Sequence, residues 1–215
     1  MLEKFAFQGV LTSVITMCPT PVVLLILAVN FADADRPVVV TGASGRTGSI
    51  IYSMLKQRGV DVRGFVRNAT KAKEVLKCSK CDESEGIYVG DITEPASLVP
   101  VMDDASALVI TTGAVPVCSR YDSPNWWDAP NCYFLPGNTP SEIDWLGGKN
   151  QVFAFGNAYQ HEGIQGRIFL ISEMGMTDPT AFLETLGTNA TSGHTAFHKK
   201  VRLFSKFLLF TGIDE

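Results

Sequence analysis

The sequence lacks any run of lysine or arginine residues, and its formal net charge is −4 at pH 7. Proteins that bind nucleic acids carry clustered positive charge, so this composition argues against a general nucleic-acid binder. The 215 residues also contain no internal repeat and no low-complexity segment. With 46% hydrophobic and 19% charged residues, the composition is that of a globular protein with one sizeable domain.

Candidate metal ligands are scarce as well. Cys78 and Cys81 form one Cys-x-x-Cys sequence, with neither a second such pair nor a nearby histidine. This pattern argues against zinc, and no metal site is predicted. Of the five cysteines, Cys18 lies in the N-terminal segment that we interpret below as a signal peptide. If that segment is removed, an even number of four cysteines remains. Cys118 and Cys132 bracket a loop; in an oxidising compartment they would close it as a disulfide, and free thiols are the alternative.

The first 34 residues differ from the rest because they hold a nearly uncharged stretch that ends in the apolar run 21–29. Ala32 and Ala34 stand at the −3 and −1 positions of a cleavage site, which predicts a secretory signal peptide over residues 1–34. An uncleaved membrane anchor is the alternative, since residues 10–29 are long enough to cross a bilayer. Only that alternative implies contact with a membrane. A signal of this kind leads to the secretory route or forms the first half of a plastid address.

Residues 35–215 are expected to form one domain, because strand and helix patterns alternate after Arg36. This alternation predicts a Rossmann-type α/β fold with a doubly wound parallel sheet. The expected strands are 37–42, 60–67, 86–91, 107–114 and 167–175, and the expected helices are 46–58, 70–77, 95–102 and 141–161. In the first helix, Ile50, Ile51, Met54 and Leu55 are expected to face the sheet.

Residues 115–140 interrupt the alternation with a long loop that is rich in proline and aromatic residues and has no helical or strand period. A loop of this length in a compact domain is usually functional or disordered, and its aromatic content argues against disorder. It leaves the carboxyl end of the fourth strand, where α/β sheets bind ligands. We interpret it as a lid or wall of a substrate site; a surface insertion is the alternative.

Three glycines, at positions 42, 45 and 48, lie between the first strand and the first helix. The first allows a tight turn, and the second lets a pyrophosphate approach the backbone amides. The third lets the helix pack close to the sheet, with its positive N-terminus toward the phosphates. Ser44 and Thr47 add hydroxyl donors. The order of strand, glycine loop and helix therefore predicts that Gly42, Ser44, Gly45, Thr47 and Gly48 bind a dinucleotide.

The residue after the second strand bears on the choice of dinucleotide. NAD-specific folds place an acidic residue there, where it binds the 2′-hydroxyl of the ribose. This position is Arg67, and Arg46 stands within the glycine loop. Two guanidinium groups suit a 2′-phosphate, so the sequence favours NADP (NADPH) over NAD. The alternative is that either arginine is a solvated surface charge.

These motifs resemble the atypical short-chain dehydrogenase/reductases, the NAD(P)-binding NmrA-like group that includes plastid Rossmann proteins and flavin-reductase relatives. The resemblance extends from Val38 to Phe210 and rests on VTGASGRTG, VRGFVRN, VGDITEPASL, ITTGA, IDWLGGKNQV and RIFLISEMGMTDP. It implies that Asp91 and Ile92 flank the adenine. It also implies that Thr111, Thr112 and Gly113 lie beside the cofactor, and that Lys149 and Asn150 face the cofactor or position the sheet.

The residues at the expected catalytic positions differ from those of that family. The resemblance places Ser172 at the active-site serine and Lys200 at the lysine of Tyr-x-x-x-Lys, in which the lysine lowers the tyrosine pKa for proton transfer. Ala196 stands where the tyrosine is expected, and many atypical members share this loss. Tyr52 and Lys56 match the motif literally but lie in the first helix, away from the expected nicotinamide. The chain also ends where the family's sixth strand begins, so the fold is predicted to be truncated after the helix that follows the fifth strand.

Three functions remain open. The favoured one is an NADP-dependent oxidoreductase that passes hydride to a small carbonyl, quinone or flavin acceptor, with Ser172 and Lys200 beside the nicotinamide. For a flavin or quinone, positioning alone suffices without a tyrosine. The second is a non-catalytic NADP(H) sensor or assembly factor, which the missing tyrosine favours. A structural domain with a vestigial loop is least favoured, because internal glycines cost stability.

Overall fold

The computed structural model describes residues 36–118, 132–158 and 166–171. Within these ranges, five strands form a parallel sheet in the order β3-β2-β1-β4-β7. They are β1 (Val38–Thr41), β2 (Val62–Val66), β3 (Ile87–Val89), β4 (Ala107–Ile110) and β7 (Arg167–Leu170). Because β1 has β2 on one side and β4 on the other, the order of the strands reverses at β1. The structure thus confirms the predicted Rossmann-type α/β fold.

The central strands are buried on both faces. All four residues of β1 and all four of β4 are buried, as expected for continuous apolar runs in a parallel sheet that helices cover. Thr41 pairs with Phe65 of β2 and with Ile110 of β4. The three strands therefore end at the same level, and the segments that follow them start from one edge of the sheet.

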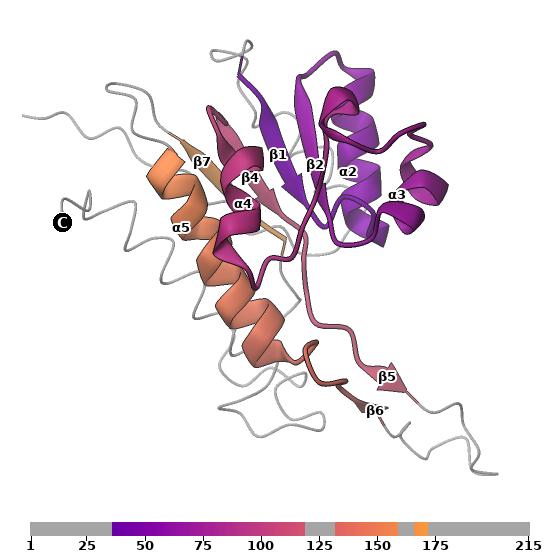
Figure 1. The fold of residues 1–215 in the computed structure, drawn as a ribbon, viewed down its shortest axis with the longest axis vertical. Coiled ribbons are helices and arrows are strands. Elements are labelled where there is room, and N and C mark those ends of the chain that lie inside the picture. The colour runs from indigo at the N-terminus through magenta and orange to yellow at the C-terminus, as the bar shows by residue number, and fades with distance from the viewer. Residues whose placement is uncertain (1–35, 119–131, 159–165, 172–215) are drawn as a thin grey trace, which may run out of the picture.

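Helices cover both faces of this sheet (Figure 1). They are α2 (Arg46–Gln57) and α3 (Ala69–Leu76) on one face, and α4 (Pro95–Met102) and α5 (Gly148–Ala158) on the other. Ile51 of α2 belongs to a core cluster with Val40, whereas Met102 and Phe155 belong to a second cluster with Val39. The side chains of neighbouring β1 residues thus pack on opposite faces of the sheet, as the two-residue period of a strand requires.

The buried face of α2 differs from the expectation: Ile50 lies outside it, and Met54 is only half-buried. Ile51 and Leu55 are buried as expected, but Ile50 is 54% exposed and Tyr52 is only 6% exposed. Gly48, Ile51, Tyr52 and Leu55 follow the i, i+3, i+4, i+7 spacing of a single helix face. Ile50 lies one residue outside this spacing, so the prediction that it faces the sheet is wrong.

The loop over residues 115–140 contains two short strands that its sequence pattern did not predict. β5 (Val117–Cys118) and β6 (Cys132–Tyr133) pair antiparallel, with Cys118 opposite Cys132 in the register. The expectation of a loop without strands is therefore wrong at these positions. The backbone brings the two bracketing cysteines together, while the choice between a disulfide and free thiols stays a prediction.

The helix expected from residue 141 begins there, but its first turns are π-helical. This segment, η3 (Ser141–Gly147), continues directly into α5. A capping box precedes it: Thr139 N and Thr139 Oγ1 donate to Glu142 Oε2 at 3.1 and 2.7 Å, and Glu142 N donates to Thr139 Oγ1 at 3.4 Å. The hydrogen bonds from Thr139 lower the pKa of Glu142.

Predictions for the two ends of the chain concern residues that the structure does not describe. The signal peptide or anchor over residues 1–34 is one of them, and the truncation after the helix that follows the fifth strand is the other. Among the described residues, no helix combines the length and the apolar character needed to cross a membrane.

Candidate functional site

The glycine loop connects β1 to α2 at the carboxyl edge of the sheet. Gly42 has a φ of +72°, a conformation that residues with a side chain rarely adopt. Its N–H donates to Phe65 O at 3.0 Å, and the Gly45 N–H donates to Gly42 O at 2.8 Å. The loop is therefore a tight turn held against the end of β2.

Gly48 lies where the first turn of α2 passes over this loop. A Cβ atom at Gly48 would overlap with Gly42 O and would lie 2.6 Å from Thr111 Oγ1. The carbonyl belongs to the backbone and cannot rotate away. The close approach of α2 to the end of β1 therefore requires a glycine at this position.

The N-terminus of α2 is open toward the same edge. Gly45 is the N-cap and contributes no side-chain cap, and the first turn contains no acidic residue. The first N–H groups of a helix carry partial positive charge and suit a phosphate. Ser44 and Thr47 are half-buried beside these groups, and Arg46, the first residue of the helix, is exposed.

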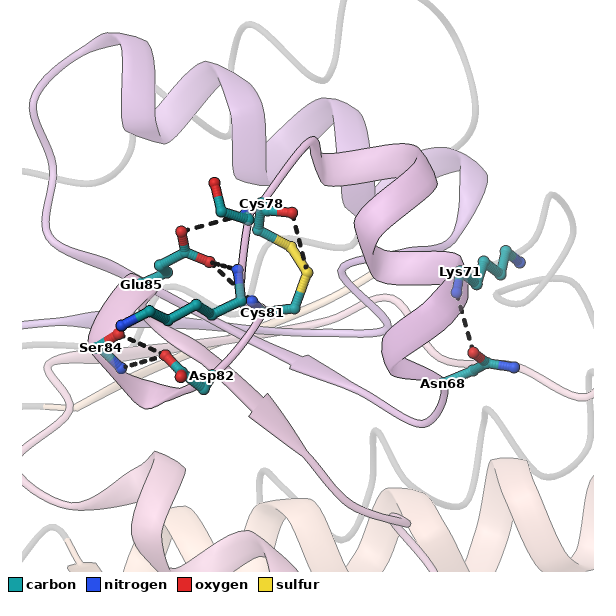
Figure 2. The surroundings of a disulfide bond; sticks show 9 residues. Asn68, Lys71, Cys78, Cys81, Asp82, Ser84 and Glu85 are labelled. Carbon is teal, nitrogen blue, oxygen red and sulfur yellow. Dashed lines mark hydrogen bonds between the residues drawn. A yellow bond between two sulfur atoms is a disulfide. The ribbon is translucent and has the colours of Figure 1, made fainter.

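Arg67 follows β2 directly and is also exposed. The next residue, Asn68, is the N-cap of α3, and its side-chain oxygen accepts from Lys71 N at 3.0 Å (Figure 2). This cap fixes the direction of the chain just after Arg67. Because Thr41 and Phe65 are register partners, Arg67 and the glycine loop leave the sheet side by side.

Asp91 and Ile92 form the turn after β3. Asp91 Oδ1 accepts from Thr93 N at 2.9 Å and from Thr93 Oγ1 at 2.7 Å. Ile92 is 7% exposed, and its carbonyl accepts from Asn150 Nδ2 at 3.0 Å. Of the two roles that the resemblance implies for Asn150, this contact favours positioning of the sheet.

The residues after β4 are tied to their neighbours by their hydroxyl groups. Thr111 Oγ1 donates to Thr41 O at 2.6 Å, which joins the ends of β4 and β1. Thr112 Oγ1 accepts from Gln151 Nε2 at 3.1 Å, and the same nitrogen donates to Gly147 O at 2.9 Å. Thr112 is therefore held by α5, and the half-buried Gly113 follows it.

Sequence reasoning missed two buried polar residues at this edge. Asp144 is 4% exposed, and its Oδ1 accepts from Ala114 N at 2.8 Å; Gln151 is fully buried. Both residues fix the segment that leaves β4 against η3 and α5. Their seven-residue spacing places them on one face of a helix, but it does not show that this face is buried.

The remaining residues named from the sequence lie elsewhere in the fold or outside the described residues. Ser172 and Lys200, the predicted catalytic residues, lie outside the described ranges. Tyr52 packs in the core between α2 and the sheet, where burial raises its pKa. The Lys56 Nζ atom lies 5.8 Å from the centre of the Tyr52 ring. Lys149 is half-buried near the start of α5.

The structure brings together the segments that follow four parallel strands. They are the glycine loop after β1, Arg67 after β2, Asp91 and Ile92 after β3, and Thr111, Thr112 and Gly113 after β4. In open α/β sheets, ligands bind outside the carboxyl ends of the strands, where the strand order reverses. The glycine loop lies at that point.

Comparisons with known sequences agree with this geometry. The model of the NAD(P)H-binding family matches residues 42–200. A chloroplastic protein of Arabidopsis thaliana is 36% identical over 165 residues, which cover 75% of this chain and 47% of that protein. Sanguinarine reductase of Eschscholzia californica is 32% identical over 177 residues, which cover 73% of this chain and 61% of that enzyme. The chain thus spans less than two thirds of the length of either relative.

Solved structures show the same fold at low sequence identity. The enzyme WbmH of Bordetella bronchiseptica, in complex with NAD+, matches 80% of this chain and 52% of its own, with a TM-score of 0.51 and 20% identity. A short-chain dehydrogenase of Streptomyces avermitilis matches 80% of this chain and 59% of its own, with a TM-score of 0.54 and 18% identity. These likenesses concern the Rossmann fold alone.

Proposed function

Because this chain belongs to the NAD(P)H-binding family and is an atypical protein of the short-chain dehydrogenase/reductase type, we propose that it is an NADP(H)-dependent oxidoreductase. The observation that carries the proposal is the glycine loop, where Gly42 has a positive φ and Gly48 has no room for a Cβ. Bound NADPH supplies a hydride for a small carbonyl, quinone or flavin acceptor.

The preference for NADP(H) rests on charge. In this proposal, Arg46 and Arg67 hold the 2′-phosphate; both are exposed and both start at the edge where the glycine loop lies. No acidic residue occupies the first turn of α2, and Arg67 stands where an NAD-specific fold has an acid. Gly45, with Ser44 and Thr47, would receive the pyrophosphate at the N-terminus of α2.

The remaining residues divide between the two ends of the dinucleotide. Asp91 and Ile92 would flank the adenine, and Thr112 with Gly113 would line the nicotinamide half. Ser172 and Lys200 would lie on the acceptor side. A reductase among the relatives supports hydride transfer.

The chloroplastic relatives support a plastid destination, with residues 1–34 as its signal and residues 35–215 as the dinucleotide-binding domain.

A titration of NADPH and NADH by calorimetry tests the cofactor. We expect tighter binding of NADPH, and we expect Arg67→Gln and Arg46→Gln each to weaken NADPH by about 10- to 100-fold, since bonds to charged groups contribute about 1.5–3 kcal/mol. NADH should change little. Arg58→Gln is the matched control, because Arg58 is exposed at the opposite end of α2. Equal losses for both dinucleotides would contradict the 2′-phosphate assignment.

The second candidate is a non-catalytic NADP(H) sensor or assembly factor. Ala196 in the place of the family's tyrosine favours it. The loss of NADPH absorbance separates the two functions when carbonyl, quinone and flavin acceptors are each supplied in turn. An oxidoreductase consumes NADPH with one of these classes, whereas a sensor binds NADPH and consumes none.

A further inference from the structure

The Cys-x-x-Cys sequence between α3 and β3 forms a disulfide that the dinucleotide site does not use. Cys78 and Cys81 are bonded, and their Cα atoms lie 5.1 Å apart (Figure 2). Cys81 is 3% exposed and belongs to the core cluster that includes Ala72 and Ile87, whereas Cys78 packs against this cluster but is partly exposed. Solvent therefore reaches Cys78 more readily than Cys81.

A carboxylate holds this loop independently of the sulfur atoms. Glu85 Oε2 accepts from Cys81 N at 2.7 Å and from Lys80 N at 2.9 Å, and Glu85 Oε1 accepts from Ser79 N at 3.2 Å (Figure 2). These backbone hydrogen bonds, led by the bond from Cys81, lower the pKa of Glu85. Because these bonds involve no sulfur, we expect them to persist when the disulfide is reduced.

The buried cysteine is also suited to the reduced state. Cys81 Sγ lies 3.5 Å from Cys78 O. In the disulfide this sulfur carries no hydrogen, but in the dithiol its S–H group has that carbonyl as an acceptor. Cys81 belongs to the core cluster in the disulfide form, and we expect the same packing to hold its thiol. We therefore expect the loop to accept the reduced pair with little change of backbone.

We propose that Cys78 and Cys81 form a reversible thiol–disulfide exchange site whose reaction partner is a dithiol. A thiolate of the dithiol attacks Cys78 Sγ, the bond between the two cysteines breaks, and Cys81 leaves as a thiolate that takes up a proton. The second thiolate of the dithiol then attacks the reagent sulfur bound to Cys78, and Cys78 leaves and takes up a proton. The protein gains two electrons and two protons, and the dithiol becomes a disulfide.

A metal site is the competing use of the same atoms. Cys78, Cys81 and Glu85 place one ligand atom each within 4.8 Å of one another. Zinc in a structural site takes four ligands, and among the described residues this group supplies three. The Glu85 oxygens also accept three backbone hydrogen bonds already. These contacts favour the redox pair.

Two serine variants test which sulfur exchanges. The reduced full-length chain is mixed with glutathione disulfide, and peptide mass spectrometry locates the adducts. We expect Cys81→Ser to retain glutathione on Cys78, since the buried partner that would displace it is gone. We expect Cys78→Ser to acquire glutathione on Cys81 at least about tenfold more slowly, because Cys81 is buried. Wild-type protein should re-form its disulfide, and Ser79→Ala, at an exposed position, should behave as wild type.

A second measurement on the wild-type chain keeps the proposal testable if a serine variant fails to fold. Far-UV circular dichroism is recorded while dithiothreitol reduces the pair and oxidised dithiothreitol restores it. We expect reduction and re-oxidation without loss of helical signal. Reduction that occurs only together with unfolding would show a structural disulfide and would overturn the proposal. Equal amounts of glutathione adduct in the two variants would also overturn the proposal. The same holds if the reduced protein retains zinc and the bound zinc prevents re-oxidation.

Discussion

Replacement of Gly48 by alanine tests the contact between α2 and the glycine loop. In an unobstructed helix this change would stabilise the protein by about 1 kcal/mol, because glycine has the greater conformational freedom in the unfolded chain. At Gly48 the new methyl group would overlap with Gly42 O and press on Thr111 Oγ1, 2.6 Å away. Overpacking costs about 1–3 kcal/mol, and a displaced Thr111 would lose its bond to Thr41 O, which contributes about 1 kcal/mol. We expect a net destabilisation of about 1–3 kcal/mol.

Gly156→Ala is the matched control, since Gly156 also lies in a helix but a Cβ there would meet nothing within 4 Å. It should stabilise the protein by about 0.5–1 kcal/mol. Urea denaturation measures both free energies of unfolding, and calorimetry measures NADPH binding. Because Gly48→Ala shifts the loop, NADPH binding should weaken at least about tenfold, whereas Gly156→Ala should leave it unchanged. If both variants bound NADPH like wild type and were equally stable, the close approach would not matter.

Substitutions at three further positions probe single contacts. Asp144→Ala leaves Ala114 N without its carboxylate acceptor and should lower the free energy of unfolding, measured in urea, by about 1–3 kcal/mol. Asp144→Asn keeps an acceptor oxygen and should lower it less. Equal losses in the two variants would argue against the hydrogen bond. Thr139→Ala removes the capping hydroxyl and should cost about 0.5–2 kcal/mol, and an unchanged midpoint would contradict the cap. The stability difference between wild type and Glu85→Gln should be constant above about pH 5. It should shrink as the pH falls below the unfolded pKa of about 4.3 and through the lower folded pKa; a difference independent of pH would refute the role of the carboxylate.

The sheet and the glycine loop could be predicted because their signals are local. Each strand is a short apolar run next to a helical pattern. Gly42 is required by its own positive φ, and Gly48 by its close approach to Gly42 O six residues earlier in the chain. The error at Ile50 arose from a stripe of paired apolar residues, in which sequence alone does not show which residue of each pair faces the core. Tyr52 occupies that face instead, because a tyrosine can bury its ring as well as an isoleucine.

Features that depend on distant partners could not be predicted. Asp144 and Gln151 look like exposed helix residues until Ala114 and Thr112, 30 and 39 positions away, are brought next to them. The strands β5 and β6 are two residues long each, too short for a period. The Cys78–Cys81 bond had no distinguishing signal either, because a single Cys-x-x-Cys serves metals, free thiols and disulfides alike.

The α3 helix lies between the proposed dinucleotide site and the Cys78–Cys81 disulfide. Arg67 and Asn68 precede it and Cys78 follows it after Lys77, across eight helical residues that span about 12 Å. Thermodynamic linkage is reciprocal: if the disulfide strengthens NADPH binding by some factor, NADPH must stabilise the disulfide by the same factor. The NADPH level around the protein would then shift the redox state of two cysteines at the far end of α3.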